Sequence, residues 1–189
     1  VANSRYEEID VIVPSNYSYM YQVYWDNLNN GNVTTAYVNI GVVGSSYTGF
    51  SNLPSSGTAS YTGGTEFFYA SAGGTSGSIY AIEGDASFSV DWANKQISGS
   101  FTNLDGTNDN DQSVTFPNIT MNAANIIEDT TYVNELNESL AYFEGNLEFS
   151  GFDTSSWNNK IWGHFMGPAY NEIGGTYELT ASSGADGAG

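Results

Sequence analysis

The chain contains a single histidine, His164, which is its clearest candidate ligand for a metal or a haem iron. It lies in the segment IWGHFMG, where period-two alternation puts Trp162 and Met166 on the same face of an expected strand as the imidazole. An imidazole can serve as an axial ligand, and Met166 could assist it. The alternative is an ordinary histidine on a strand face, because one histidine without partners is a weak indication of a metal site. His164, Met166 and Trp162 are therefore the candidate ligand-binding residues, with haem as the candidate cofactor.

A second group of candidate ligands is a run of oxygen donors in the segment DGTNDND, residues 105–111. Calcium prefers about six to eight oxygen ligands, and a loop rich in Asp and Asn could supply several of them. The ordered spacing of an EF-hand loop and its distal glutamate are absent from this segment. A solvated turn at the tip of a hairpin explains the same composition. The candidate calcium ligands are Asp105, Asn108, Asp109 and Asp111.

The carboxylates offer only a weak case for catalysis. No serine-histidine-carboxylate arrangement is recognisable around His164. A glycosidase needs two carboxylates roughly 5–10 Å apart, and Glu144, Glu148 and Glu172 would be the candidates in a small jelly-roll enzyme. The general acidity of the chain explains the same glutamates, so we expect a protein without catalytic activity.

The elements that must position these residues are β-strands, and the clearest pair lies in residues 86–101, ASFSVDWANKQISGSF. Apolar and small side chains alternate with polar ones on both sides of the link Asn94-Lys95-Gln96. The positions of the first kind are Ala86, Phe88, Val90, Trp92, Ile97, Gly99 and Phe101. This pattern predicts a β-hairpin with one buried face and one solvated face.

Similar alternation predicts the other elements. A second hairpin is expected from 17–25 and 34–44, and an edge strand or detached arm from 6–13, just before Pro14. Further strands are expected at 57–62, 65–71, 78–83, 113–121 (broken at Pro117), 143–149, 160–166 and 175–181, with a polar loop at 103–112. The spacing of Val133, Leu136 and Leu140 predicts one short helix within 128–142.

Composition restricts the class of protein. Aromatic residues make up 15% of the 189 residues and charged ones 13%, with 22 glycines, which favours an all-β domain. The formal net charge of −18 would repel a phosphate backbone or an anionic lipid surface, so we expect no nucleic acid among the partners. Cysteine is absent. No apolar run approaches the ~20 residues of a membrane-spanning helix, so we expect no membrane insertion. The lysine-poor composition is typical of an extracellular or cell-surface protein, with a signal sequence already removed before Val1.

Four segments resemble one family in their order along the chain. They are GTASYTGG at 57–64, GDASFSVDWANKQISGSF at 84–101, FEGNLEFSG at 143–151 and IWGHFMGPAYNEIGGTYEL at 161–179. Together they are similar to the β-barrel domain of the transferrin-binding protein B family, which includes bacterial surface lipoproteins and secreted solute- or haem-binding relatives. The last segment is the most specific: Gly163, Phe165, Gly167, Pro168, Glu172, Gly174 and Gly175 stand in the family's order, although Ala169 comes one place early.

The resemblance implies an antiparallel eight-stranded barrel of the up-and-down type, with extra N-terminal strands and a binding function. We therefore divide the chain into an N-terminal arm or edge strand at 1–16, a barrel domain with its lead-in hairpin at 17–181, and a Gly/Ala-rich tail at 182–189. The motif residues are expected to have scaffold roles, with a turn at Gly167-Pro168 and with Glu172 hydrogen-bonded to backbone amides near it.

Two functions remain open at this level. The first is a non-catalytic binding module on the bacterial surface for a host protein, haem or a small solute. The second is a self-assembling subunit of an extracellular filament or surface layer, in which an N-terminal strand carrying Ile9, Val11 and Val13 completes the sheet of a neighbouring copy.

Overall fold

The computed structural model describes residues 5–12, 18, 20–29, 37–44, 46–70, 79–108, 110–150 and 157–181, with side chains at 18, 44, 46–67, 80–108, 110–150 and 159–178. These residues form two antiparallel sheets and one turn of 3-10 helix, η1 (Phe50–Asn52). In this part of the chain no helix is long and apolar enough to cross a membrane. The predicted all-β class is confirmed.

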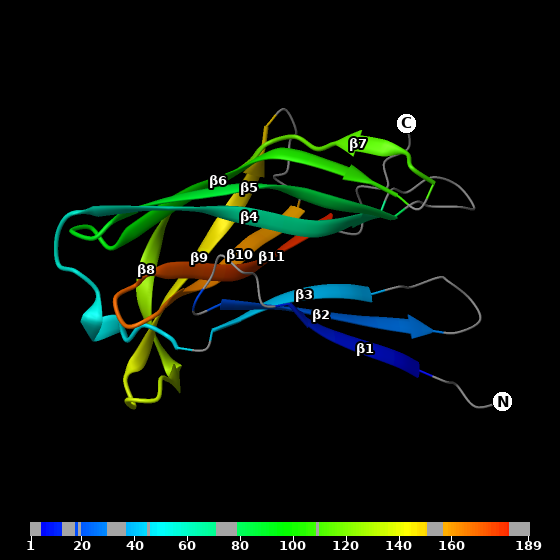
Figure 1. Cartoon of the computed structure of the whole chain (residues 1–189). Coiled ribbons are helices and arrows are strands. Elements are labelled where there is room, and N and C mark those ends of the chain that lie inside the picture. Colours follow the sequence, from blue (N-terminus) through cyan, green and yellow to red (C-terminus); the bar gives the residue numbers. More distant parts are fainter. Residues whose placement is uncertain are drawn as a thin grey trace.

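The smaller sheet contains the N-terminal strands in the order β1-β2-β3. Its strands are β1 (Arg5–Ile12), β2 (Met20–Asn29) and β3 (Tyr37–Gly44). The predicted second hairpin is present as β2 and β3, and β1 is an edge strand paired with β2 rather than a detached arm. Figure 1 shows this sheet lying alongside the larger one, below β4, β5 and β6 in that view.

The larger sheet has eight strands, in the order β11-β10-β9-β8-β6-β5-β4, with β7 paired to β6. Their bounds are β4 (Thr58–Ala70), β5 (Ile79–Asp91), β6 (Gln96–Thr107), β7 (Ser113–Thr115), β8 (Ile119–Val133), β9 (Ser139–Phe149), β10 (Trp157–Met166) and β11 (Glu172–Ala181). The sheet curls into a nearly closed barrel, so the predicted eight-stranded antiparallel barrel with extra N-terminal strands is confirmed (Figure 1).

Side chains bridge the two ends of the curled sheet. The Tyr61 hydroxyl of β4 donates a hydrogen bond to the Tyr170 carbonyl at 2.8 Å, next to β11. Further along the same seam, Thr65 Oγ1 lies 3.1 Å from the Tyr177 hydroxyl. Burial raises the pKa of Tyr61 to about 12, with a smaller contribution from Tyr170. The Tyr61 hydroxyl is therefore a neutral donor at ordinary pH.

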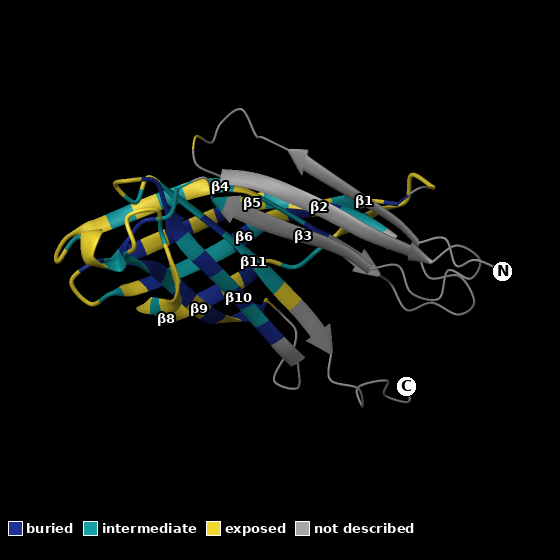
Figure 2. Cartoon of the chain, turned by 90° about the horizontal axis from the view of Figure 1, so that it is seen from below, coloured by how far each residue is buried: buried dark blue, intermediate teal, exposed yellow. Residues whose placement is uncertain are grey.

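The barrel interior is filled by apolar side chains. Buried and exposed positions alternate along the strands (Figure 2), as a sheet with one wet face requires. The apolar face of the predicted 86–101 hairpin is buried, with Trp92 only 2% exposed and Phe101 3%. Aromatic rings pack against one another across the interior; they include Phe67, Phe88, Phe101, Phe143, Phe165, Trp92 and Tyr177. The described interior is a packed core, in which burial of each large ring contributes about 1.5–3 kcal/mol.

Several strands are longer than predicted. The expected strands at 57–62 and 65–71 are one strand, β4, because Gly63 and Gly64 stay in register with Ala86 and Asp85. The strand at 78–83 continues through Gly84 into β5, with a bulge where the β5–β6 register shifts. A Cβ on Gly84 would lie 2.7 Å from the Thr102 carbonyl oxygen, so this close approach needs a glycine. Strand β6 likewise runs to Thr107, into the expected loop, while the break near Pro117 is confirmed between β7 and β8.

The predicted helix within 128–142 is wrong. The segment contains the end of β8, a tight turn and the start of β9. The Asn134 side-chain oxygen accepts hydrogen bonds from the backbone amides of Leu136 and Glu138 at 3.0 and 2.9 Å, which closes the turn. Val133 and Leu136 are exposed while Leu140 is buried, so their spacing does not reflect one apolar face. Local side-chain hydrogen bonding at the turn outweighed the helical spacing.

Residues 47–49, which link the two sheets, are hydrogen-bonded between strands of the barrel. The Thr48 backbone amide donates a hydrogen bond to the Phe165 carbonyl at 2.9 Å, and the Thr48 carbonyl accepts one from the Ala141 amide at 3.0 Å. Residues 47–49 therefore lie between the ends of β9 and β10. The Thr48 hydroxyl, which is 1% exposed, donates to the Gly167 carbonyl at 2.6 Å. Gly167 has φ +84° in the predicted turn after β10. These contacts hold the smaller sheet at this end of the barrel.

Candidate functional site

The outward side chains of β9 and β10 form a continuous surface, here called the β9–β10 outer face. Its members are Tyr142, Glu144, Lys160, Trp162 and His164. Tyr142 lies opposite His164 in the register, and Glu144 lies opposite Trp162. Neighbouring strand residues such as Ile161 are buried, so the outward residues are displayed by the pleat of a rigid sheet. The prediction that His164 and Trp162 share a face is confirmed.

His164 is enclosed by two tyrosine rings. The ring centroids of Tyr142 and Tyr47 lie 5.2 and 5.4 Å from that of the imidazole. Burial lowers the pKa of His164, while the nearby Asp129 charge and the Ala141 backbone act in the opposite direction. The imidazole is therefore neutral at physiological pH. Its Nδ1 atom is buried and has no hydrogen-bond partner among the described residues.

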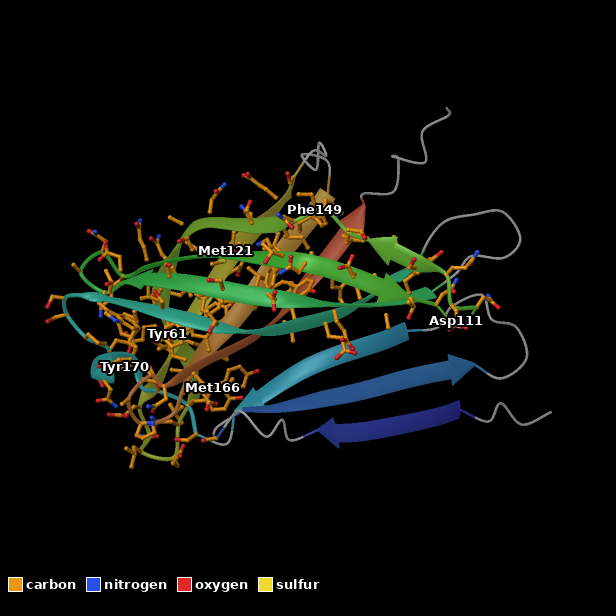
Figure 3. The ribbon with its side chains drawn as sticks, turned by 45° about the horizontal axis from the view of Figure 1, so that its top comes forward. Tyr61, Asp111, Met121, Phe149, Met166 and Tyr170 are labelled. Atoms are coloured by element: carbon orange, nitrogen blue, oxygen red, sulfur yellow. The ribbon has the colours of Figure 1, made fainter. Side chains whose placement is uncertain are left out.

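Met166 lies on the outer side of β10 but is covered. It is 1% exposed, and residue Tyr47 pairs with it through an isolated bridge. A Cβ on Gly44 would lie 3.2 Å from its sulfur, which places the thioether against the end of β3. A haem group reaching His164 or Met166 would have to displace this packing. Figure 3 shows Met166 next to the end of β3.

Glu144 and Lys160 form an ion pair beside Trp162. Hydrogen bonding from Lys160 lowers the pKa of Glu144, and smaller hydrogen-bond contributions come from Tyr142 and Trp162. The Tyr142 hydroxyl donates to the same carboxylate at 3.4 Å. Burial raises the pKa of Tyr142 to about 12. A carboxylate held ionised by a lysine is poorly suited to act as a general acid.

The other two candidate carboxylates have separate partners. Glu148 accepts a hydrogen bond from Asn122 at 2.6 Å on the outer surface. Glu172 accepts one from the backbone amide of Ser18 at 2.7 Å. The predicted bond from Glu172 to a backbone amide is present, and this amide belongs to the N-terminal segment.

The candidate calcium residues lie at the end of β6 and in the turn that follows. The Asp105 carboxylate accepts from the Thr115 hydroxyl at 2.6 Å. The Asn108 side-chain oxygen accepts from the amides of Asn110 and Gln112, each at 3.0 Å, so it is already used in closing the turn. Asp111 has φ +57°, and Asp109 lies outside the described residues. Among the described residues no three His, Cys, Asp or Glu side chains are grouped to hold a metal.

The structure separates the two predicted ligand sites. Figure 3 shows Asp111 at one end of the barrel, and Met166 and Tyr170 towards the other. Of the candidate assembly residues, Ile9 and Val11 lie in β1 opposite Trp25 and Val23 of β2, and Val13 lies outside the described residues.

Sequence reasoning missed the two tyrosines beside His164. Tyr142 could have been found, because it alternates with Glu144 along the expected strand at 143–149 if that strand is extended backwards. Nothing local in the sequence links Tyr47 to His164, since its place depends on residues 47–49 entering between β9 and β10.

The fold defines a class of protein: an antiparallel β-barrel with a packed interior and a smaller sheet beside it. The family model described as C-lobe and N-lobe beta barrels of Tf-binding protein B matches residues 53–189. The chain belongs to this family, as the motif resemblance predicted. No curated protein sequence matches the chain.

Two solved structures are similar in fold. One is intact Ap-TbpB with its N and C lobes, with a TM-score of 0.54 and 19% identity over 93% of this chain and 35% of that one. The other is a double mutant of the vaccine antigen transferrin binding protein B from Haemophilus parasuis Hp5, with a TM-score of 0.53 and 18% identity over 92% of this chain and 34% of that one. The chain thus spans about a third of the length of either structure.

Proposed function

We propose that the chain is a non-catalytic module, displayed on the bacterial surface, that binds a host protein. The observation that carries this proposal is the family match over residues 53–189. Its physical support is the packed interior, since a barrel filled by aromatic side chains offers its outer surface and loops, not its lumen, to a partner. Tyr142 and Trp162 on a rigid sheet suit such contact, because they supply large area with a polar edge.

Transferrin is the first ligand to test, since the matched family is described by it. Immobilised chain is titrated with iron-loaded and iron-free transferrin and followed by biolayer interferometry. Saturable binding at physiological salt is the expected result. Binding to neither form, by a chain that is folded by circular dichroism, would reject transferrin as the partner.

Haem is the alternative ligand for the same module, and His164 is its candidate axial residue. An absorbance titration with hemin is compared between the wild-type chain and His164→Ala. Loss of the Soret shift in the variant would support axial ligation. Full haem affinity without the imidazole would eliminate His164 as the ligand.

Self-assembly is the second candidate function, and the position of β1 at the edge of the smaller sheet favours it. An edge strand offers a row of backbone groups that a second copy could use. Deleting residues 1–14 is expected to convert assemblies into monomers by size-exclusion chromatography. Assemblies that persist after the deletion would exclude β1 as the connecting strand.

A further inference from the structure

The β8–β9 hairpin carries the exposed apolar surface of the described chain. The large hydrophobic side chains that are exposed among the described residues all lie on it: Ile127 (46%), Tyr132 (66%), Val133 (54%) and Leu136 (73%). Figure 1 shows the hairpin extending past the body of the barrel to its turn. Several exposed apolar residues on one projecting element indicate a contact site, whereas isolated ones are ordinary.

The tip is held in one conformation by its own polar groups. The Asn134 amide and the Glu138 carbonyl form a backbone hydrogen bond at 3.0 Å, and the Asn137 amide donates to the Asn134 carbonyl at 2.9 Å. The Glu138 carboxylate accepts from Asn52 at 2.9 Å and from Asn134 at 3.0 Å, which ties the turn to η1. Leu136 is therefore presented outwards by a fixed turn, so little ordering entropy would be lost when it binds.

The charged side chains of the hairpin segment 128–138 are of one sign, and Lys95 lies outside this segment, with its ammonium 5.9 Å from the Phe50 ring of η1. Glu128, Asp129, Glu135 and Glu138 flank the apolar side chains, and no Lys or Arg occurs between Lys95 and Lys160. At this tip an anionic lipid surface would be repelled, and so would the same acidic tip of a second copy. A partner surface with an apolar pocket rimmed by Lys and Arg would be complementary in both respects.

We infer that the tip of the β8–β9 hairpin is the docking element for a basic protein surface, with Leu136 and Tyr132 entering an apolar pocket of the partner. This inference rests on the proposed binding function and names the surface that performs it. Leu136 serves as the central anchor and the carboxylates act on the association rate and on the choice of partner.

The first experiment uses transferrin as the probe and compares three variants with the wild-type chain. Leu136→Ser combined with Tyr132→Ser is expected to weaken binding at least tenfold. Glu128→Gln combined with Glu135→Gln is expected to slow association and flatten its dependence on salt. The matched control, Glu83→Gln with Glu178→Gln, removes the same charge from exposed positions on β5 and β11 and should bind like wild type after screening. Wild-type affinity in the Leu136/Tyr132 variant would overturn the inference and leave the binding function intact.

A second measurement is independent of transferrin. A chromatography resin carrying a phenyl group beside a quaternary amine reproduces the chemistry of the inferred partner surface. The wild-type chain is expected to elute at higher salt than the Leu136/Tyr132 variant, although their net charges are equal. If transferrin does not bind and the elution shift is present, transferrin is rejected and the docking tip is supported. Equal elution of the two chains would overturn the docking tip.

Discussion

Two hairpins leave the same end of the barrel, β5–β6 and β8–β9 (Figure 1). Their turns are built alike. Asp91 accepts from the Asn94 amide at 3.1 Å, as the Asn134 side chain does from Leu136. Each turn also contains a non-glycine residue with a left-handed backbone, Lys95 with φ 51° and Asn137 with φ 61°. Turn chemistry alone would therefore assign the two hairpins the same role.

Their apolar residues have opposite environments. Trp92 of the β5–β6 turn is 2% exposed, whereas Leu136 of the β8–β9 turn is 73% exposed. The Trp92 ring packs at 5.4 Å from Phe165 and 5.2 Å from Tyr170, and Lys95 donates to the Pro54 carbonyl at 2.5 Å. The first hairpin closes the core, and the second projects beyond it. A turn sequence therefore forms the hairpin, and the residues around it decide whether the hairpin stabilises the fold or displays a surface.

The largest effect on stability is expected at the β5–β6 turn, where the Trp92 ring is buried. Trp92→Ala should lower the free energy of unfolding by about 3–5 kcal/mol, because it removes a buried ring and leaves a cavity. Urea denaturation followed by circular dichroism measures this change. A loss below about 1 kcal/mol would contradict the assignment of Trp92 to the core.

A smaller effect is expected from opening the projecting turn. Asn134→Ala removes the acceptor for two backbone amides and should cost about 1–2 kcal/mol. Hydrogen exchange at Leu136 and Glu138 should accelerate in the variant while exchange in the core strands remains slow. Asn137→Gly is the matched control: glycine suits its left-handed backbone, so this variant should be at least as stable as wild type. Unchanged exchange in Asn134→Ala would show that the turn does not depend on that side chain.

The pH dependence of stability tests the outer face near the projecting hairpin. Burial lowers the pKa of folded His164, so between that value and the ordinary value of about 6.5 the unfolded chain binds more protons. Stability should therefore fall as the pH drops through this window. The charge of Asp129 and the Ala141 backbone raise the pKa of His164 and so limit the effect, while Tyr47 and Tyr142 pack against the imidazole ring.

The measurement is the melting temperature of wild type and His164→Gln from about pH 7.5 to about pH 5.5. The variant should lose less on acidification. The pKa of Glu144 is lowered, so this carboxylate is protonated, and its stabilising charge lost, only at a more acidic pH. Its titration therefore does not contribute to the change measured for His164. Parallel curves for the two chains would contradict a buried, neutral His164.

The smallest stability effect is expected at the exposed tip. Leu136→Ser should change the free energy of unfolding by no more than about 0.5 kcal/mol, because its side chain contributes little to the core. Leu136→Ser and Trp92→Ala are measured in the same urea series, so that the stability losses of the two hairpins can be compared directly. A loss above about 2 kcal/mol would mean that Leu136 is buried in the folded protein, and the two hairpins would then be alike.

Much of the fold could be predicted locally. Alternation predicted the 86–101 hairpin, the shared face of His164 and Trp162 and the break near Pro117, because a strand's face is decided residue by residue. Prediction failed at 128–142, where three apolar residues have helical spacing. Spacing alone does not reveal that Leu136 sits on a turn and Leu140 inside a sheet, since both positions depend on pairing with other strands.

The all-β class, the strong acidity of the chain and the motifs that assign the family can all be read from the sequence, since composition and short-range pattern carry these properties. Tertiary structure alone decided that Tyr47 and Tyr142 enclose His164 and that residues 47–49 lie between β9 and β10. It also decided that Leu136 of the β8–β9 tip is exposed while Trp92 of the β5–β6 turn is buried. The physical reason is that burial is set by contacts between segments far apart in the chain, and such contacts leave no local pattern.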